Sequence, residues 1–234
     1  MATSTIYGTI NADLLTGTAM DDAIYAKGGD DTVDGGDGND SIFGGAGHDF
    51  INGWLGDDAL FGAEGNDTLW GYSGNDLLSG GAGNDQLFGD AGNDVIYGDD
   101  GNDIMSGGTG DDALAGGAGA DVMAGGEGND FLTGGQGKDV LTGGAGADRF
   151  VWYSPDEAVA GVSKRDVVSD FEVGVDKLEL AGFHIALEDI HFYSIASGRS
   201  TVLAIDLDHN GTNDFEIQLN NVTFGTFNTN DIVL

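Results

Sequence analysis

The chain of 234 residues contains no cysteine, one proline and only seven lysine and arginine residues. Without cysteine there is neither a disulfide framework nor a thiolate metal site, so any metal must be held by oxygen or imidazole ligands. The scarcity of basic residues excludes the clustered charges that nucleic-acid binding requires. No apolar stretch approaches the length of a membrane span, and Met1 to Ile10 lacks the pattern of a cleaved export signal.

Recognisable catalytic motifs are also missing. The four histidines, His48, His184, His191 and His209, form no His-Glu-x-x-His zinc motif, and the sequence contains no Gly-x-Ser-x-Gly elbow. We therefore predict a protein that is not an enzyme, with an unrecognised active site as the open alternative.

What the chain has in abundance is glycine and acidic residues, 44 and 41 of them, and a net charge of −34. From Gly8 to Val151 the sequence repeats every nine residues without a gap, as sixteen copies of the frame G-G-x-G-x-D-x-U-x. The sixth position is always aspartate, from Asp13 to Asp148, and the eighth is always apolar, from Leu15 to Phe150. Repetition at a short fixed period predicts a solenoid.

The frame also predicts how one repeat folds. Glycines at positions one, two and four allow left-handed backbone conformations and hence a tight turn. Positions seven to nine form a short strand whose middle residue points inward. If nine residues make half a coil, residues eighteen apart stack directly, so that Asp40 lies over Asp58. The predicted fold is all-β, a right-handed parallel β-roll with a narrow apolar core.

Between stacked turns this arrangement places two aspartates and several main-chain carbonyls, a set of hard oxygens suited to calcium. Eight loops on each side leave room for at most about seven ions per side, and so for up to about fourteen ions in all. These ions would neutralise the repeat block, which without a cation is too acidic and glycine-rich to fold. The alternative is that the aspartates only cap turns through hydrogen bonds to the backbone; their unbroken register over sixteen copies favours metal.

The repeats resemble those of the RTX family of bacterial proteins, whose repeats form a calcium-loaded β-roll. The resemblance implies that the sixth-position aspartates are side-chain ligands and that loop glycines supply carbonyl ligands. The implied side-chain ligands are Asp31, Asp40, Asp49, Asp58, Asp67, Asp76, Asp85, Asp94, Asp103, Asp112, Asp121, Asp130, Asp139 and Asp148. The implied glycine ligands are Gly36, Gly38, Gly45, Gly47, Gly81, Gly83, Gly108, Gly110, Gly117, Gly119, Gly126, Gly128, Gly135, Gly137, Gly144 and Gly146.

The first copies depart from the frame. Asn11, Met20, Ala26 and Lys27 replace glycines there, which weakens the ligand pattern around Asp13, Asp22 and Asp31. Upstream, Thr5-Ile6-Tyr7 matches the strand positions of one more copy, but Ser4 replaces its aspartate. We interpret residues 1–7 as a cap strand of a repeat region that spans residues 1–151.

After Val151 the register stops, and strands are expected at residues 166–168, 177–180, 200–207 and 215–219. Residues 143–151 with Asp170-Phe171, Asp176-Lys177-Leu178 and Gly182-Phe183 resemble the C-terminal region of serralysin-type RTX exoproteins. The resemblance implies that residues 152–234 cap the roll and carry an uncleaved signal for the type I secretion machinery. Asp231-Ile232-Val233-Leu234 fits such a signal, and an ordinary closing strand is the alternative.

Two further features leave alternatives open. Asp206, Asp208 and Asn210 begin like an EF-hand loop, but Ile217 stands where its glutamate should be, so a hairpin is favoured over an additional calcium site. Trp54, Trp70, Tyr72 and Phe88 converge on one edge by spacing, either as a stabilising stack or as a docking surface for a glycan or another protein chain. A second stack of Tyr25, Phe43 and Phe61 favours the structural interpretation.

Together these features predict a secreted, extracellular bacterial protein that folds on binding calcium and serves as a structural, binding or matrix module. The second hypothesis is an accessory module of a polysaccharide-active enzyme, similar to the repeat modules of alginate epimerases, or a glycan-binding protein.

Overall fold

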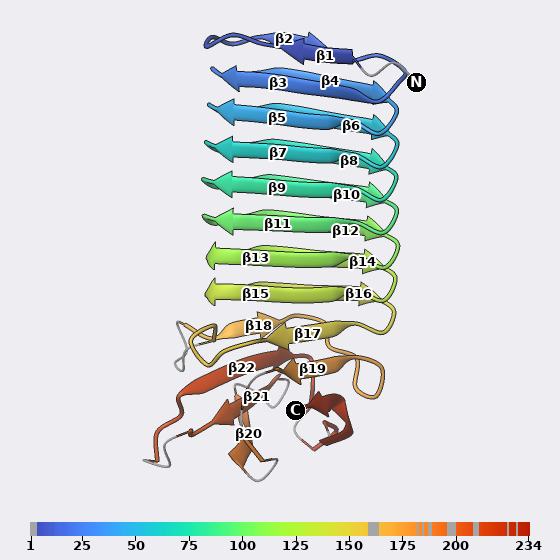
Figure 1. The fold of residues 1–234 in the computed structure, drawn as a ribbon. Helices are drawn as coiled ribbons and strands as arrows, with labels where there is room; N and C mark the ends of the chain where they lie inside the picture. The colour runs from blue at the N-terminus through green and yellow to red at the C-terminus, as the bar shows by residue number, and fades with distance from the viewer. Residues whose placement is uncertain are drawn as a thin grey trace.

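The computed structural model describes residues 4–158, 164–181, 183, 185–186, 189–195, 200–207, 211–223, 225–227 and 229–234. The described residues contain no α-helix, and none of their helical segments is long and apolar enough to cross a membrane. Their strands form two sheets, through which the chain winds as a stack of coils (Figure 1).

Sheet A consists, in spatial order, of β1 (Ser4–Tyr7), β3 (Asp22–Gly28), β5 (Ser41–Ala46), β7 (Ala59–Glu64), β9 (Leu77–Ala82), β11 (Val95–Asp100), β13 (Ala113–Gly119), β15 (Phe131–Gly137), β17 (Arg149–Trp152), β19 (Lys177–Leu180) and β23 (Ile232–Val233). Sheet B consists of β2 (Leu14–Thr16), β4 (Thr32–Asp37), β6 (Phe50–Leu55), β8 (Thr68–Ser73), β10 (Gln86–Ala91), β12 (Ile104–Thr109), β14 (Val122–Glu127), β16 (Val140–Ala145), β18 (Asp166–Val168), β22 (Phe215–Asn220), β21 (Ser200–Ile205) and β20 (Ile190–Ile195). A 3-10 turn, η3 (Thr229–Asp231), precedes β23.

The register of the sheets confirms the predicted parallel β-roll. Ser41 pairs with Ala59 and Gln86 with Ile104, in each case eighteen residues apart and in parallel. Successive strands alternate between the two sheets, so nine residues make half a coil.

The core is the column of eighth-position residues. From Ile24 to Phe150 each of these side chains is at most 2% exposed. One apolar side chain per strand therefore fills the space between the sheets, as the sequence predicts, and the eighth position cannot be polar without leaving a buried group unpaired.

The strands differ from the prediction in length. β4 runs through six residues, Thr32–Asp37, and so continues from position seven of one copy through position three of the next. The glycine at position one lies within the strand and does not adopt a left-handed conformation, unlike Gly36 and Gly38, whose φ angles are 111° and 120°. Apart from Ala26 in the third copy, position one is glycine. Lack of space is the reason, because a Cβ on Gly35 would lie well under 3.0 Å from Asp40 Oδ2.

The tail continues both sheets beyond the repeats. β18 and β22 extend sheet B and β19 and β23 extend sheet A, all in parallel, while β21 and β20 pair antiparallel at the end of the stack (Figure 1). The four predicted tail strands are present with small shifts in their ends. β20 was not expected, and β23 is the closing strand that the sequence offered as the alternative at residues 231–234. The sheets run across Val151 without interruption, and the division into a repeat region and a cap stays a prediction.

Candidate metal centre

The sixth-position aspartates form two ladders, one along each edge of the roll. In each ladder the main-chain N–H of an aspartate donates to Oδ1 of the aspartate one turn further on, as from Asp40 to Asp58 at 2.7 Å and from Asp94 to Asp112 at 2.8 Å. From Asp22 to Asp148 these residues are no more than 3% exposed. One carboxylate oxygen of each aspartate therefore does bond the backbone, as the turn-capping alternative proposes.

The second carboxylate oxygen has no such role in fourteen of the aspartates. Their Oδ2 atoms are buried and have no hydrogen-bond partner within the part of the chain that the structure describes. The fourteen residues are Asp31, Asp40, Asp49, Asp58, Asp67, Asp76, Asp85, Asp94, Asp103, Asp112, Asp121, Asp130, Asp139 and Asp148. A buried polar oxygen without a partner is costly, so a repeated set of them indicates a missing positive partner.

Main-chain oxygens surround the same space. The carbonyl of Gly38, at position four, faces the loop one turn further on so closely that a Cβ on Gly56 would overlap it. The carbonyl of Asp90 at position two faces Gly108 in the same way, and that of Gly116 at position one faces back toward Gly98. Each gap between stacked loops is thus lined by carbonyls from both loops and by aspartate oxygens.

This donor set fits calcium, which takes six to eight oxygen ligands and accepts main-chain carbonyls. Among the described residues no three acidic, histidine or cysteine side chains gather at one point, so the carbonyls are essential to any metal site. The predicted glycine ligands occupy positions two and four of their copies, where the left-handed conformation directs the carbonyl into the gap. A calcium ion would supply the positive charge that the orphaned oxygens lack.

The electrostatics of the loops point the same way. Burial, with smaller contributions from neighbouring aspartates, raises the pKa of Asp58, Asp76 and Asp112 to about 7 and that of Asp139 to about 8. Burial also raises the pKa of Asp85 to about 6. A bound cation favours the charged carboxylate and removes this penalty.

Gly107→Ala tests whether position one of the frame must lack a Cβ. Its Cβ would lie well under 3.0 Å from both Asp112 Oδ2 and the Gly125 carbonyl. We expect a loss of about 2–4 kcal/mol of unfolding free energy in saturating calcium, measured by denaturant titration, together with a lower calcium count. Thr109→Ala, which changes an exposed side chain in the same loop, is the matched control. Equal stability of the two variants would contradict this account of the loop.

A second ladder, at position five, was missed by the sequence analysis. The N–H of Asn84 donates to Asn66 Oδ1 at 2.8 Å, and that of Asn66 to His48 Nδ1 at 2.7 Å. The pattern repeats along both edges wherever position five is Asn, Asp or His. The frequency of Asn and Asp at this position was the available signal. His48 therefore has a structural role.

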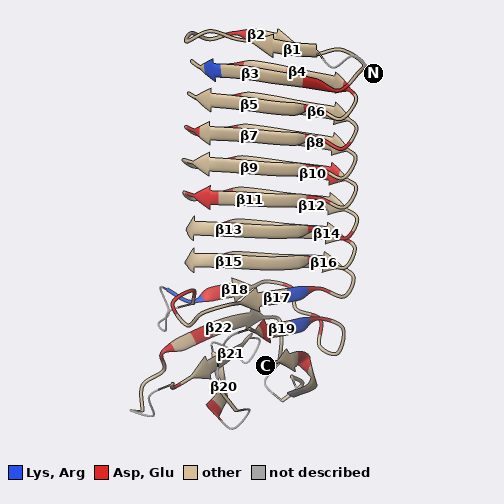
Figure 2. Cartoon of the chain, in the orientation of Figure 1, with Lys and Arg blue, Asp and Glu red and all other residues tan. Residues whose placement is uncertain are grey.

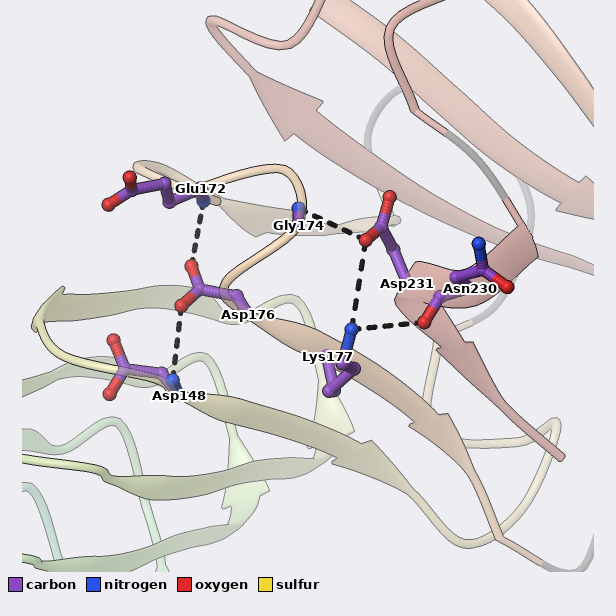
Figure 3. A network of polar contacts seen from close by, with 7 residues as sticks. All are labelled: Asp148, Glu172, Gly174, Asp176, Lys177, Asn230 and Asp231. Carbon is purple, nitrogen blue, oxygen red and sulfur yellow. Dashed lines mark hydrogen bonds and ion pairs between the residues drawn. The ribbon is translucent and has the colours of Figure 1, made fainter.

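The tail carries on the ladder with residues outside the repeat frame (Figure 3). The N–H of Asp148 donates to Asp176 Oδ1 at 3.0 Å, and Asp176 Oδ2 accepts the N–H of Glu172 at 2.7 Å. One turn further, Asp231 Oδ1 accepts the N–H of Gly174 at 3.0 Å, and Lys177 Nζ lies 3.8 Å from it. Asp231 is thus the last residue of η3, directly before Ile232 and Val233 form the closing strand β23.

The EF-hand-like segment begins at Asp206, directly after β21. β21 and β22 pair antiparallel on either side of it, and Asp206 Oδ2 accepts the N–H of Gly211 at 2.7 Å. Asp208 and Asn210 lie outside the described residues, so a calcium ion at this segment stays a prediction. His184 and His209 also lie outside them, and His191 is exposed on β20.

The aromatic residues form the two stacks that their spacing predicts. Ring centroids are 4.7 Å apart for Trp54 and Tyr72, 5.5 Å for Tyr72 and Trp70, and 4.2 Å for Trp70 and Phe88, with interplanar angles of at most 25°. The stack on sheet A runs from Tyr7 to Phe61 in the same manner. Because the rings cover each other's faces, the geometry favours the structural interpretation. A glycan or protein partner at this edge stays a prediction.

Comparison with known proteins identifies the repeats. The model of the RTX calcium-binding nonapeptide repeat matches residues 7–42, 25–60, 34–69, 55–87, 79–123 and 115–150, more than half of the chain. The chain therefore belongs to the RTX family, and its roll is a calcium-binding structural module. The C-terminal resemblance to serralysin-type proteins stays a prediction.

Solved structures that match the chain include two repeat subunits of a mannuronan C5-epimerase from Azotobacter vinelandii. The R3 subunit is 25% identical with a TM-score of 0.46, and the match covers 56% of this chain and 78% of that one. The R2 subunit is 24% identical with a TM-score of 0.44, covering 68% and 91%. An extracellular lipase from Serratia marcescens matches at 17% identity with a TM-score of 0.24. The match covers 100% of this chain and 40% of the lipase. No curated protein matches the chain.

Proposed function

We propose that the chain is a secreted bacterial protein that remains unfolded in the exporting cell, folds outside on binding calcium, and then serves as a structural module of an extracellular matrix or surface. The observation that carries this proposal is the set of fourteen buried carboxylate oxygens without hydrogen-bond partners in the described part of the chain. Folding without a cation would bury all of them unpaired, at a cost that the narrow core cannot offset.

The charge of the chain supports coupling between calcium and folding. Its net charge is −34, and in Figure 2 the acidic residues follow the strand ends and loops along the length of the stack. Self-repulsion of this size opposes a compact state, and bound divalent ions reduce it. Weak sites with dissociation constants of about 0.1–1 mM stay empty in the cytosol and fill outside the cell.

The C-terminal end supports export through a signal that is not cleaved. Ile232 and Val233 pair with Leu178 and Glu179 of β19, and Asp231 is fully buried. Val233 and Leu234 are 41% and 49% exposed, but an exporter could reach the side chains of Asp231 and Ile232 only in the unfolded chain, which is the state that low calcium favours. Folding after export would then bury these two residues.

Secretion can be tested in a bacterium that carries a type I exporter. We expect the full chain to accumulate in the medium with its N-terminus intact, and a chain ending at Val151 to remain in the cells. Equal export of both chains, or cleavage of an N-terminal segment, would refute the proposed route.

A further inference from the structure

The first turn of the roll pairs its carboxylates differently from the fourteen repeat aspartates that follow it. Asp22 Oδ2 accepts the N–H of Thr18 at 2.6 Å and its hydroxyl at 2.9 Å, and Asp22 Oδ1 accepts the N–H of Ser4 at 3.2 Å. In the other ladder Asp13 Oδ2 accepts the N–H of Thr9 at 2.6 Å. The oxygen that is orphaned from Asp31 to Asp148 is therefore satisfied by the protein itself in the first two copies.

The cause lies at position two of the frame. Wherever Oδ2 is orphaned, position two holds a left-handed backbone, whether it is glycine, as Gly36 with φ 111°, or another residue, as Trp54 with φ 81°. Thr9 and Thr18 stand at the same position without a left-handed backbone, a conformation that β-branched residues resist. Their N–H groups are turned toward the carboxylate instead. A cation in this place would face the positive end of an N–H dipole.

The opposite end of the stack is closed in the same way. Asp139 N–H donates to Asp166 Oδ1 at 2.9 Å, and Asp166 Oδ2 accepts the indole N–H of Trp152 at 2.8 Å. The two ladders of orphaned oxygens thus lie between ends in which N–H groups of the protein take the second oxygen.

A lysine adds positive charge to the first turn. Lys27, the basic residue of β3 (blue in Figure 2), donates from Nζ to the carbonyl of Gly8 at 2.6 Å and lies 5.5 Å from the centre of the Tyr7 ring. Gly8 holds the first position-one carbonyl of the chain, and in later turns such carbonyls face the gap between loops. The Lys27 ammonium group therefore places a positive charge beside this carbonyl.

From these contacts we infer that Thr9 and Thr18 exclude calcium from the first turn, so that the calcium array begins at Asp31 and Asp40. The inference rests on calcium binding by the repeats and specifies where it stops. The first turn is then a cap that the protein closes with its own donors.

Counting bound ions tests the boundary, because native mass spectrometry in saturating calcium resolves single ions. Asp22→Asn and Asp58→Asn remove the same oxygen at the same frame position, one before and one after the boundary. We expect Asp22→Asn to bind as many ions as the unaltered chain and Asp58→Asn to bind at least one fewer. Loss of an ion from Asp22→Asn would overturn the inference.

A gain of binding provides the second test. The double variant Thr18→Gly with Met20→Gly restores the glycines of the frame, and Thr9→Gly with Asn11→Gly does so in the other ladder. We expect each of these two variants to bind one ion more than the unaltered chain. Thr18→Ala keeps the N–H without the backbone freedom of glycine, and we expect it to bind no additional ion. Failure of both glycine variants to gain an ion, in chains whose circular dichroism shows a folded roll, would overturn the inference. Failure of the unaltered chain to bind calcium would instead refute the proposed function.

Discussion

Removing calcium with a chelator should convert the folded chain into an expanded coil. The reason is that fourteen buried carboxylate oxygens lose their positive partner while the chain keeps its net charge of −34. We expect the β signal in circular dichroism to disappear and the radius of gyration to rise toward roughly 50 Å, the value for an unfolded chain of this length. Adding calcium back should restore the roll cooperatively, with a midpoint at about 0.1–1 mM.

Magnesium is the control for this experiment. It prefers octahedral geometry and keeps several of its waters, so it should not fold the chain at concentrations where calcium does. A β spectrum that survives in excess chelator would show that the roll is stable with its carboxylates unpaired, and the proposed mechanism would then be wrong.

The second large effect concerns pH: protonation of the buried aspartates at low pH should stabilise the folded chain in part when calcium is removed. Burial raises the pKa of Asp58 and Asp76 from an ordinary 3.8 to about 7 in the folded chain, and that of Asp139 to about 8. A group whose pKa is raised by folding binds its proton more tightly in the folded state. Its contribution to stability is therefore complete below about pH 4 and is lost as the pH rises through 6 to 8.

We accordingly expect the chelated chain to show more β structure at pH 4 than at pH 8. Calcium should show the opposite dependence, because it competes with protons for the same oxygens, so its midpoint should rise as the pH falls below about 7. Sodium chloride at about 1 M and pH 8 screens general charge repulsion without protonating the carboxyls, which separates the two causes. If salt restores as much structure as acid does, buried protonation is not the reason.

Asp22 is an internal exception that the structure explains. Burial raises its pKa, but the hydrogen bonds from Thr18 and Ser4 outweigh that effect and leave the pKa below its ordinary value. The same residue type at the same frame position thus has a lowered pKa where N–H groups donate to its carboxylate and a raised pKa where Oδ2 is buried without a donor. Asp22 therefore has no unmet need for a cation.

The features that could be predicted from the sequence are those that each repeat encodes locally. The eighteen-residue register, the buried apolar column and the stacked aspartates follow from glycine spacing and one invariant carboxylate, and all three are present. The predicted strands were too short because a glycine at position one is typical of a turn. Gly35 instead lies within β4, and it is glycine because a Cβ there would overlap Asp40 Oδ2.

The tail was harder to predict because the aspartates that continue the ladder there do not follow the eighteen-residue spacing of the repeats. Asp166 follows Asp139 by 27 residues and Asp176 follows Asp148 by 28, in place of the regular eighteen. Their role depends on contacts with the last repeats and not on a local motif, so no periodicity identifies them. The position-five ladder was hidden differently, because the frame treats that position as unrestricted although Asn84 and its counterparts bond there.

The aspartate hydrogen bonds divide the roll into identical layers, so its length can change only in whole layers. Each aspartate N–H reaches only to the carboxylate of the next turn, and the core side chain of each strand meets its counterparts eighteen residues away. A pair of repeats is thus a complete layer that adds about 4.8 Å to the height of the stack. Duplication or deletion of eighteen codons would change the length of the rod in whole steps while leaving both closed ends intact.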